Sequence, residues 1–221
     1  ISAMLRVQRN VSEVIATIML NFVAIRLVGF AVHGPLMESA GRYPQSEALG
    51  ASARLPMLAS GVHSGVAIAF LLVPVTWFVL HRTALGFRWR ATGDNAEAAR
   101  LAGLAPSGAI VSAMIASGAL AGLAGAIEVT GVTGRLFEQF SSGQGYTAIA
   151  VALLARLHPF GVAASALFFG ALAAGSGSMQ RVAGVSAVFV AIVQALAILA
   201  LLASDSPWLR RCTSGAARET A

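Results

Sequence analysis

Residues Ser107–Ile127 read SGAIVSAMIASGALAGLAGAI, a stretch without a single charged side chain. At about 1.5 Å per helical residue, it is about as long as the hydrocarbon core of a bilayer is thick. The whole chain has the same character, because 57% of its 221 residues are hydrophobic and 11% are charged. Soluble domains are about 25% charged, so the composition predicts a helical membrane protein.

Further apolar runs lie on both sides of this stretch, and together they predict about six transmembrane or partly spanning helices. The predicted helices are Val14–Val32, Ser64–Leu80, Ser107–Ile127, Gly145–Arg156, Phe160–Gly175 and Val185–Ala203. We therefore expect an all-α polytopic membrane protein in which residues 1–221 form a single transmembrane domain.

Three segments between or within these helices need separate treatment. The apolar run in Gly145–Arg156 is too short to cross a bilayer. It is either a half-helix, buried in protein or lining a cavity, or part of a span that begins near Phe137. The polar segment His33–Val62 is long for an unstructured loop, so we expect it to fold partly on itself. We expect Ser176–Gly184 to form a short turn.

The stretch just before Ser107 is of a different kind. Residues Gly93–Leu104 read GDNAEAARLAGL, a pattern typical of an exposed helix with Asp94 or Asn95 as its N-cap. It belongs to a charged loop, residues 82–106, that joins two predicted membrane spans. The sequence therefore predicts a short polar helix outside the membrane.

The arginines predict on which side of the membrane this loop lies. All 15 basic residues are Arg, and one of them, Arg26, falls within a predicted span. With the C-terminus in the cytoplasm and the spans alternating, the larger group is cytoplasmic, as the positive-inside rule requires. The cytoplasmic group is Arg6, Arg9, Arg82, Arg88, Arg90, Arg100, Arg156, Arg210, Arg211 and Arg218. The external group is Arg42, Arg54, Arg135 and Arg181. Loop 82–106 is thus expected in the cytoplasm.

The composition also excludes several kinds of chemistry. A P-loop needs a Lys to reach the nucleotide phosphates, and the chain has none, so any ATP and Mg²⁺ must be bound by another chain. A lone cysteine, Cys212, gives neither a disulfide framework nor a metal site. The spans carry no HExxH motif and no Ser/His or Asp/Asp pair, so we expect no catalytic residues and no enzyme activity. A secondary transporter is a weaker alternative, because the spans lack a cluster of carboxylates.

A family resemblance rests on three stretches. Glu97-Ala98-Ala99 followed by Gly103 resembles the EAA-x-x-x-G pattern of bacterial ATP-binding cassette (ABC) importer permeases. The longer run LGFRWRATGDNAEAARLAGL, Leu85–Leu104, is similar to permeases of the branched-chain amino acid, ribose and simple-sugar group. NVSEVIATIMLNFVA (Asn10–Ala24) and GYTAIAVALLARLHPFG (Gly145–Gly161) resemble permease subunits of nucleoside or simple-sugar uptake systems. The resemblance covers essentially the whole chain, which matches the C-terminal part of longer permeases.

The resemblance implies a subunit that moves nucleosides, or simple sugars, across the bacterial plasma (inner) membrane. A branched-chain amino acid is an alternative substrate. The implied partners are a separate ABC ATPase subunit that binds ATP and Mg²⁺, a second permease subunit (identical or different) and an external substrate-binding lipoprotein. In such permeases the EAA loop forms a coupling helix that docks on the ATPase. The residues implied here are Gly93, Asp94, Asn95, Glu97, Ala98, Ala99, Arg100, Leu101 and Gly103.

Candidate residues for the substrate path come from the polar groups near the spans. Asn21 lies near the middle of the first span, where it either hydrogen-bonds a neighbouring helix or faces the path. Tyr146 and Thr147 begin the short apolar segment. A nucleoside offers an aromatic face and hydroxyl groups, so Tyr146 is expected to stack and Asn21 to hydrogen-bond.

Overall fold

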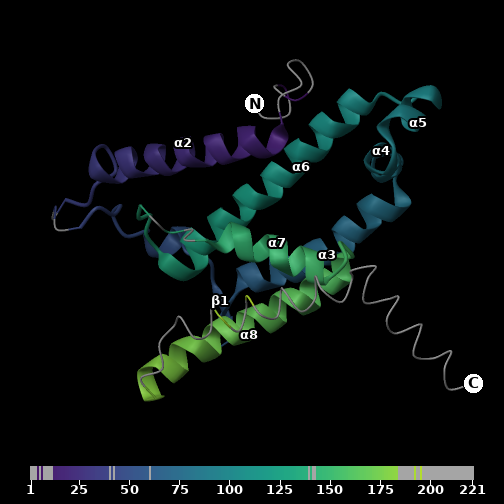
Figure 1. Ribbon diagram of the computed structural model, residues 1–221. Coiled ribbons are helices and arrows are strands. Elements are labelled where there is room, and N and C mark those ends of the chain that lie inside the picture. Colours follow the sequence, from purple (N-terminus) through teal and green to yellow (C-terminus); the bar gives the residue numbers. More distant parts are fainter. Residues whose placement is uncertain are drawn as a thin grey trace, which may run out of the picture. The chain divides into compact units, whose positions relative to one another are not determined.

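The computed structural model describes residues 4, 6, 12–39, 41, 43–59, 61–138, 140, 143–183, 192 and 195. The chain divides into two compact units, Ile1–Ser142 and Gly143–Ala221, and each is described by itself. Figure 1 labels the helices α2 to α8 and the strand β1.

The first unit contains helices, two short strands and one π-helix. Its elements are α2 (Glu13–His33), the 3₁₀ turn η1 (Ala51–Ala53), β1 (Met57–Ala59), β2 (Val62–His63), α3 (Ser64–Arg82), α4 (Ala84–Asp94), α5 (Ala96–Leu101), α6 (Pro106–Ile127) and the π-helix η2 (Glu128–Thr133). The second unit contains α7 (Gln144–Leu154) and α8 (Pro159–Ala183).

Four described helices are long and apolar enough to cross a membrane, which confirms the predicted fold class. The four spans are Val14–His33, Ser64–Arg82, Pro106–Thr133 and Pro159–Ser176. The helix α7 is shorter, and it begins after Gly143 in a left-handed turn, so the half-helix alternative is the one observed. The predicted span Val185–Ala203 lies outside the described residues, apart from Ile192 and Ala195.

Two helices run further than the sequence indicated. The third span continues past Ile127 as the π-helix η2, where the hydroxyl of Thr130 donates to the carbonyl of Ala126. The helix α8 continues to Ala183, so the predicted turn over Ser176–Gly184 is wrong. Glycine and serine weaken a helix without breaking it. The hydroxyl of Ser178 donates to the carbonyl of Gly175 within the same helix, so this hydroxyl needs no hydrogen bond to solvent.

The π-helix packs closely against the start of α3. The imidazole of His63 lies against Gly131, where an added Cβ would come within 2.8 Å of Nδ1. That Nδ1 is buried and has no hydrogen-bond partner within the described residues. The missing side chain at Gly131 therefore lets the ring fit between the two elements.

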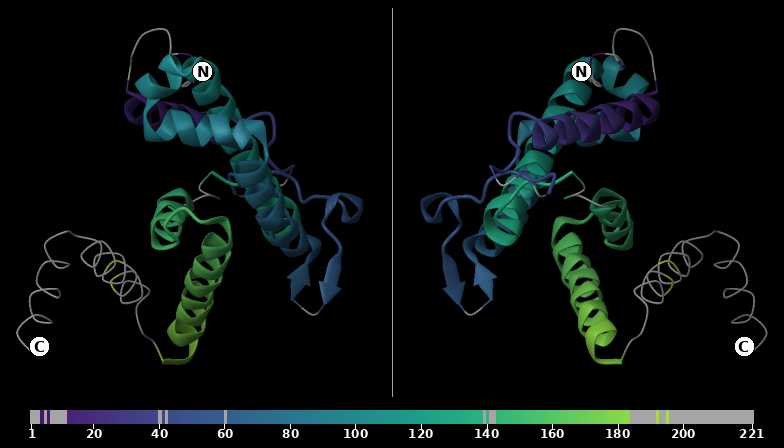
Figure 2. Two further views of the ribbon diagram at one scale, coloured as in Figure 1. Left: turned by 90° about the vertical axis from the view of Figure 1, so that its right-hand side faces the viewer. Right: turned by 90° about the vertical axis from the view of Figure 1, so that its left-hand side faces the viewer.

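The long segment after α2 folds onto the segment after η2, as expected. The N–H of Ser46 donates to the carbonyl of Leu136 over 2.8 Å, and that of Leu49 donates to the carbonyl of Gly134 over 2.9 Å. Arg135 forms an ion pair with Glu38 at 2.8 Å. The short antiparallel hairpin of β1 and β2 then leads into α3, and Figure 2 shows its two arrows beyond the end of that helix.

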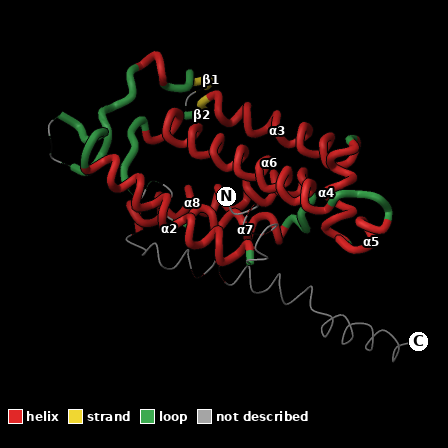
Figure 3. The backbone as a smooth tube through the Cα atoms, turned by 90° about the horizontal axis from the view of Figure 1, so that it is seen from above, coloured by secondary structure: helices red, strands yellow, loops and turns green. Residues whose placement is uncertain are grey.

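At its other end, α3 turns sharply into α4. The hydroxyl of Thr83 donates to the carbonyl of Val79 over 2.6 Å and accepts from the N–H of Gly86 over 3.2 Å. Gly86 is buried, and a Cβ there would collide with the carbonyl oxygens of Val79 and Leu80. After this corner, α4 runs beside the first turns of α6, as Figure 3 shows. The corner thereby determines the position at which α5 begins.

In the second unit, α7 and α8 meet at another tight corner. The N–H of Arg156 donates to the carbonyl of Leu153, and that of Leu157 donates to the carbonyl of Ala152, both over 3.0 Å. Arg156 and Leu157 have φ of 49° and 59°, which is uncommon for residues with side chains. The two hydrogen bonds hold this corner in place.

Candidate functional site

The short helix α5 is held at its N-terminus by Asn95. The Asn95 side-chain oxygen accepts hydrogen bonds from the N–H groups of Glu97 and Ala98, both over 3.0 Å. The Asn95 N–H donates to the carbonyl of Ala91 and so also ends α4. Of the two caps that the sequence allowed, Asn95 is the one used. A single residue thus sets the angle between α4 and α5.

The C-terminus of α5 is held by a Schellman motif centred on Gly103. The N–H of Gly103 donates to the carbonyl of Arg100, and that of Leu104 donates to the carbonyl of Ala99, both over 3.0 Å. Gly103 has φ of 82°, in the left-handed region that glycine adopts without strain. The glycine of the EAA-x-x-x-G pattern therefore has a structural reason to be glycine.

The outer face of α5 is almost entirely exposed. Leu101 is 82% exposed, whereas Ala99 is 3% exposed and packs against the chain itself. Glu97 and Arg100 form an ion pair at 3.1 Å, with both side chains largely in solvent. Such pairs contribute little stability, so their charge remains available to a partner. The helix presents an apolar anchor beside two opposite charges, with Ala99 holding it in place.

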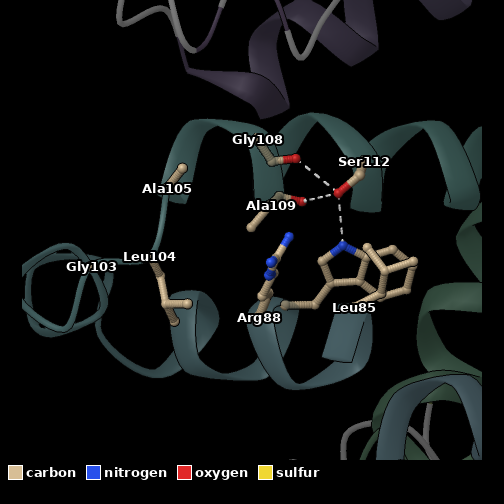
Figure 4. Close-up of a pocket in the computed structure, with 9 residues that line it drawn as sticks. Leu85, Arg88, Gly103, Leu104, Ala105, Gly108, Ala109 and Ser112 are labelled. Atoms are coloured by element: carbon tan, nitrogen blue, oxygen red, sulfur yellow. Dashed lines mark hydrogen bonds between the residues drawn. The ribbon is translucent and has the colours of Figure 1, made fainter. Parts of the chain in front are cut away.

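A cavity of about 420 Å³ lies beside α5, between α4 and the start of α6. It is lined by nine residues from these elements and their connection: Leu85, Arg88, Trp89, Gly103, Leu104, Ala105, Gly108, Ala109 and Ser112. Figure 4 shows Arg88 extending toward Ala109. The indole Nε1 of Trp89 donates to the Ser112 hydroxyl over 2.9 Å, which joins α4 to α6.

The other predicted site residues lie in different places. Gly93 and Asp94 form the last turn of α4, next to Asn95. Asn21 is exposed in the middle of α2, in the first unit. Tyr146 and Thr147 are exposed in the first turn of α7, in the second unit. The substrate-path role of these last three residues stays a prediction.

Sequence reasoning missed the residues that hold α4. Thr83, Trp89 and Ser112 link α3, α4 and α6 by hydrogen bonds, and none was proposed as part of the site. A threonine three residues before Gly86 is a recognisable N-cap signal. The contact between Trp89 and Ser112, 23 residues apart in the chain, has no such local signature.

The segment after α2 contains a small group of charged and polar side chains that contact one another. The pKa of Glu47 is lowered, mainly because its carboxylate accepts a hydrogen bond from the backbone N–H of Ser39 over 2.9 Å. Gln45 donates to the Glu38 carboxylate over 2.8 Å, alongside the ion pair with Arg135. Within the described ranges, no group of three His, Cys, Asp or Glu side chains is placed to hold a metal ion.

Comparison with known families identifies the group to which this sequence belongs. The family model described as branched-chain amino acid transport system, permease component, matches residues 1–203. The chain belongs to this permease family. Four apolar helices of membrane-spanning length agree with a multi-pass membrane permease, and the family is described as a permease component of a transport system.

The permease is similar to several transporter subunits. It is 37% identical over 217 residues to the glucose ABC transporter permease protein TsgB13 of Haloferax volcanii, covering 93% of this chain and 57% of the relative. It is 34% identical to the guanosine ABC transporter permease protein NupP of Bacillus subtilis, covering 92% of this chain and 60% of the relative. It is 30% identical to the nucleoside ABC transporter permease protein NupB of Lactococcus lactis, covering 82% and 53%.

The permease spans slightly more than half the length of these relatives. No solved structure matches it.

Proposed function

We propose that this chain is a transmembrane subunit of an ABC importer, driven by a separate ATPase chain that docks on α5. The observation that carries the proposal is the exposed face of α5, a helix fixed at both ends by Asn95 and Gly103. A helix fixed in this way can transmit motion from a partner to α4 and α6. Leu101 offers a partner apolar surface to bury, and Glu97 and Arg100 beside it offer charges that a complementary partner can match.

The role of α5 is tested with Leu101→Ser in the complete transporter. Burial of a leucine side chain contributes about 1.5–3 kcal/mol, so its loss should weaken ATPase binding by about tenfold to a hundredfold. Leu58→Ser is the matched control, because Leu58 is also exposed but lies in β1, at the other end of α3. Co-purification of the ATPase is measured, and Leu58→Ser should retain ATPase binding at the level of the parent. Normal ATPase binding by Leu101→Ser would contradict the proposal.

The proposed substrate is a nucleoside or a simple sugar. Support comes from relatives named for glucose, guanosine and nucleosides, all of which carry a hydroxylated sugar ring. A hydroxylated ring needs hydrogen-bonding groups along its path, and Asn21 and Tyr146 are exposed groups of this kind. Ligand binding by the partner lipoprotein tests the substrate class. Unchanged uptake by Asn21→Ala would remove that residue from the path.

The proposed assembly contains two permease subunits and an external binding lipoprotein in the bacterial plasma membrane. The hairpin of β1 and β2 is a candidate docking surface for the lipoprotein, because Met57 and Leu58 are exposed there. The C-terminus and the loop containing α5 are assigned to the cytoplasm by the distribution of arginines.

Cysteine labelling tests this orientation. In a Cys212→Ser background, a cysteine placed at Leu58 should react with a membrane-impermeant maleimide in intact cells. A cysteine at Ala96, which is exposed in α5, should react only after the cells are opened. The reverse pattern would overturn the assignment.

A further inference from the structure

The cavity between α4 and α6 has one charged end. Arg88 lines it and extends toward Ala109 (Figure 4). Within the described part of the chain, Arg88 forms no ion pair with a carboxylate. The first turn of α6 faces the same space, and its cap residue, Ala105, supplies no side-chain hydrogen bond to the free N–H groups there. An unpaired guanidinium in a cavity favours an anionic occupant, and the helix end adds to this preference.

The remaining walls of the cavity are apolar. Leu85 and the indole of Trp89 come from α4, and Leu104 comes from the connection between α5 and α6. The only polar atom of the indole is already bonded to Ser112, so the ring offers apolar surface to an occupant. Leu85 and Phe87 are also half exposed on α4. An occupant with an anionic group and an adjoining apolar part would match both kinds of wall.

The length of the third span places this cavity at the membrane surface. Pro106–Thr133 has 28 residues, which extend about 42 Å at 1.5 Å per residue. The hydrocarbon core is about 30 Å thick, so about 6 Å at each end lies among the lipid headgroups. Gly108 and Ala109 fall within that end. At the end of α3, the guanidinium of Arg82 lies 5.8 Å from the Trp77 ring centre, a pairing of residue types common at this depth.

We propose that this cavity is a binding site for one anionic phospholipid, with the phosphate at Arg88 and the apolar part along Leu85 and Trp89. The cavity volume of about 420 Å³ lies in the range of small-ligand sites. Because Gly103 and Leu104 form one wall, a bound lipid would support the connection that carries α5. The proposal does not depend on ATPase docking, since lipid binding can be measured without nucleotide.

The test compares two arginines on α4 in the complete transporter, reconstituted in phosphatidylcholine nanodiscs. Both side chains are exposed, but Arg88→Gln removes a cation that lines the cavity, whereas Arg90→Gln removes one that does not. Binding of spin-labelled phosphatidylglycerol should weaken about fivefold in Arg88→Gln, which is the typical contribution of one arginine beside anionic lipid headgroups. Binding in Arg90→Gln should stay within twofold of the parent. Equal weakening in both variants would overturn the proposal.

A second variant adds bulk at a residue that lines the cavity. A Cβ added at Gly108, which lines the cavity, meets no atom within 4 Å, so Gly108→Leu begins without a backbone clash, and its insertion and assembly are measured first. It should abolish the specific phosphatidylglycerol signal, and retention of that signal would overturn the site. Full displacement of the lipid by millimolar inorganic phosphate would show a soluble-phosphate site instead. Loss of the ATPase from Gly108→Leu with unchanged lipid binding would show that a protein partner fills the cavity.

Discussion

Replacing Gly103 tests how α5 is held. Gly103 has φ of 82°, and a Cβ there would meet no atom within 4 Å, so the cost of Gly103→Ala comes from the backbone alone. An L-residue with a side chain in the left-handed region costs about 1–2 kcal/mol. That energy reduces the population of the closed turn by roughly fivefold to thirtyfold. The two hydrogen bonds from Gly103 and Leu104 to α5 would open with it.

The expected order of activity is Gly, then Asn, then Ala, then Val at position 103. Asparagine tolerates the left-handed region better than alanine, and a β-branched side chain tolerates it least. Hydrogen exchange of the Leu104 amide reports the turn directly, because that N–H is bonded to Ala99. Uptake and stimulation of the ATPase by loaded binding protein report the consequence, and both should fall in the same order as protection is lost.

The control for this series is Gly170→Ala. It adds the same methyl group to an exposed glycine of α8, with helical backbone and no atom within 4 Å. Insertion and uptake should match the parent. Equal uptake by Gly103→Val and the parent, with normal expression, would refute the assignment of this glycine to coupling. Loss of uptake with full protection of the Leu104 amide would refute the mechanism through the turn.

Three further substitutions have definite expectations. Asn95→Ala removes both cap bonds and should cost about 1 kcal/mol, seen as faster exchange in α5, with Asn95→Asp restoring protection. Gly86→Val places a side chain against the carbonyl of Val79, so the transporter should fail to assemble at any expression level, and normal assembly would contradict the corner described here. Gly131→Ala should lower the melting temperature by displacing His63, and the double variant with His63→Ala should recover part of that loss. Additive losses in the double variant would rule out that contact.

Much of the fold could be predicted from local sequence. Apolar runs such as Ser64–Leu80 and Ser107–Ile127 were sufficient to predict the membrane spans, because a span requires length and hydrophobicity over one continuous segment. The capped helix at Gly93–Leu104 was also readable, since Asn95 and Gly103 act within a few residues of themselves. The continuation of α8 to Ala183 was not, because glycine and serine occur in both turns and helices.

The site beside α5 was harder to predict than α5 itself. The contact of Trp89 with Ser112 and the ion pair of Arg135 with Glu38 join residues far apart in the chain. Neither contact can be predicted from a periodicity or a residue spacing within a single sequence. The cavity at Arg88 depends on the same long-range packing, so only its basic character was visible beforehand.

The sequence by itself determined the membrane class, four of the spans and the two residue types that end α5. These properties depend on hydrophobicity and backbone preference, which act over short stretches of chain. Tertiary structure decided that Ala99 faces inward while Leu101 faces out, and that α4 and α6 enclose a cavity. It also decided how residues 43–59 fold onto the π-helix end. These features depend on which distant segments meet, and that requires the packed chain.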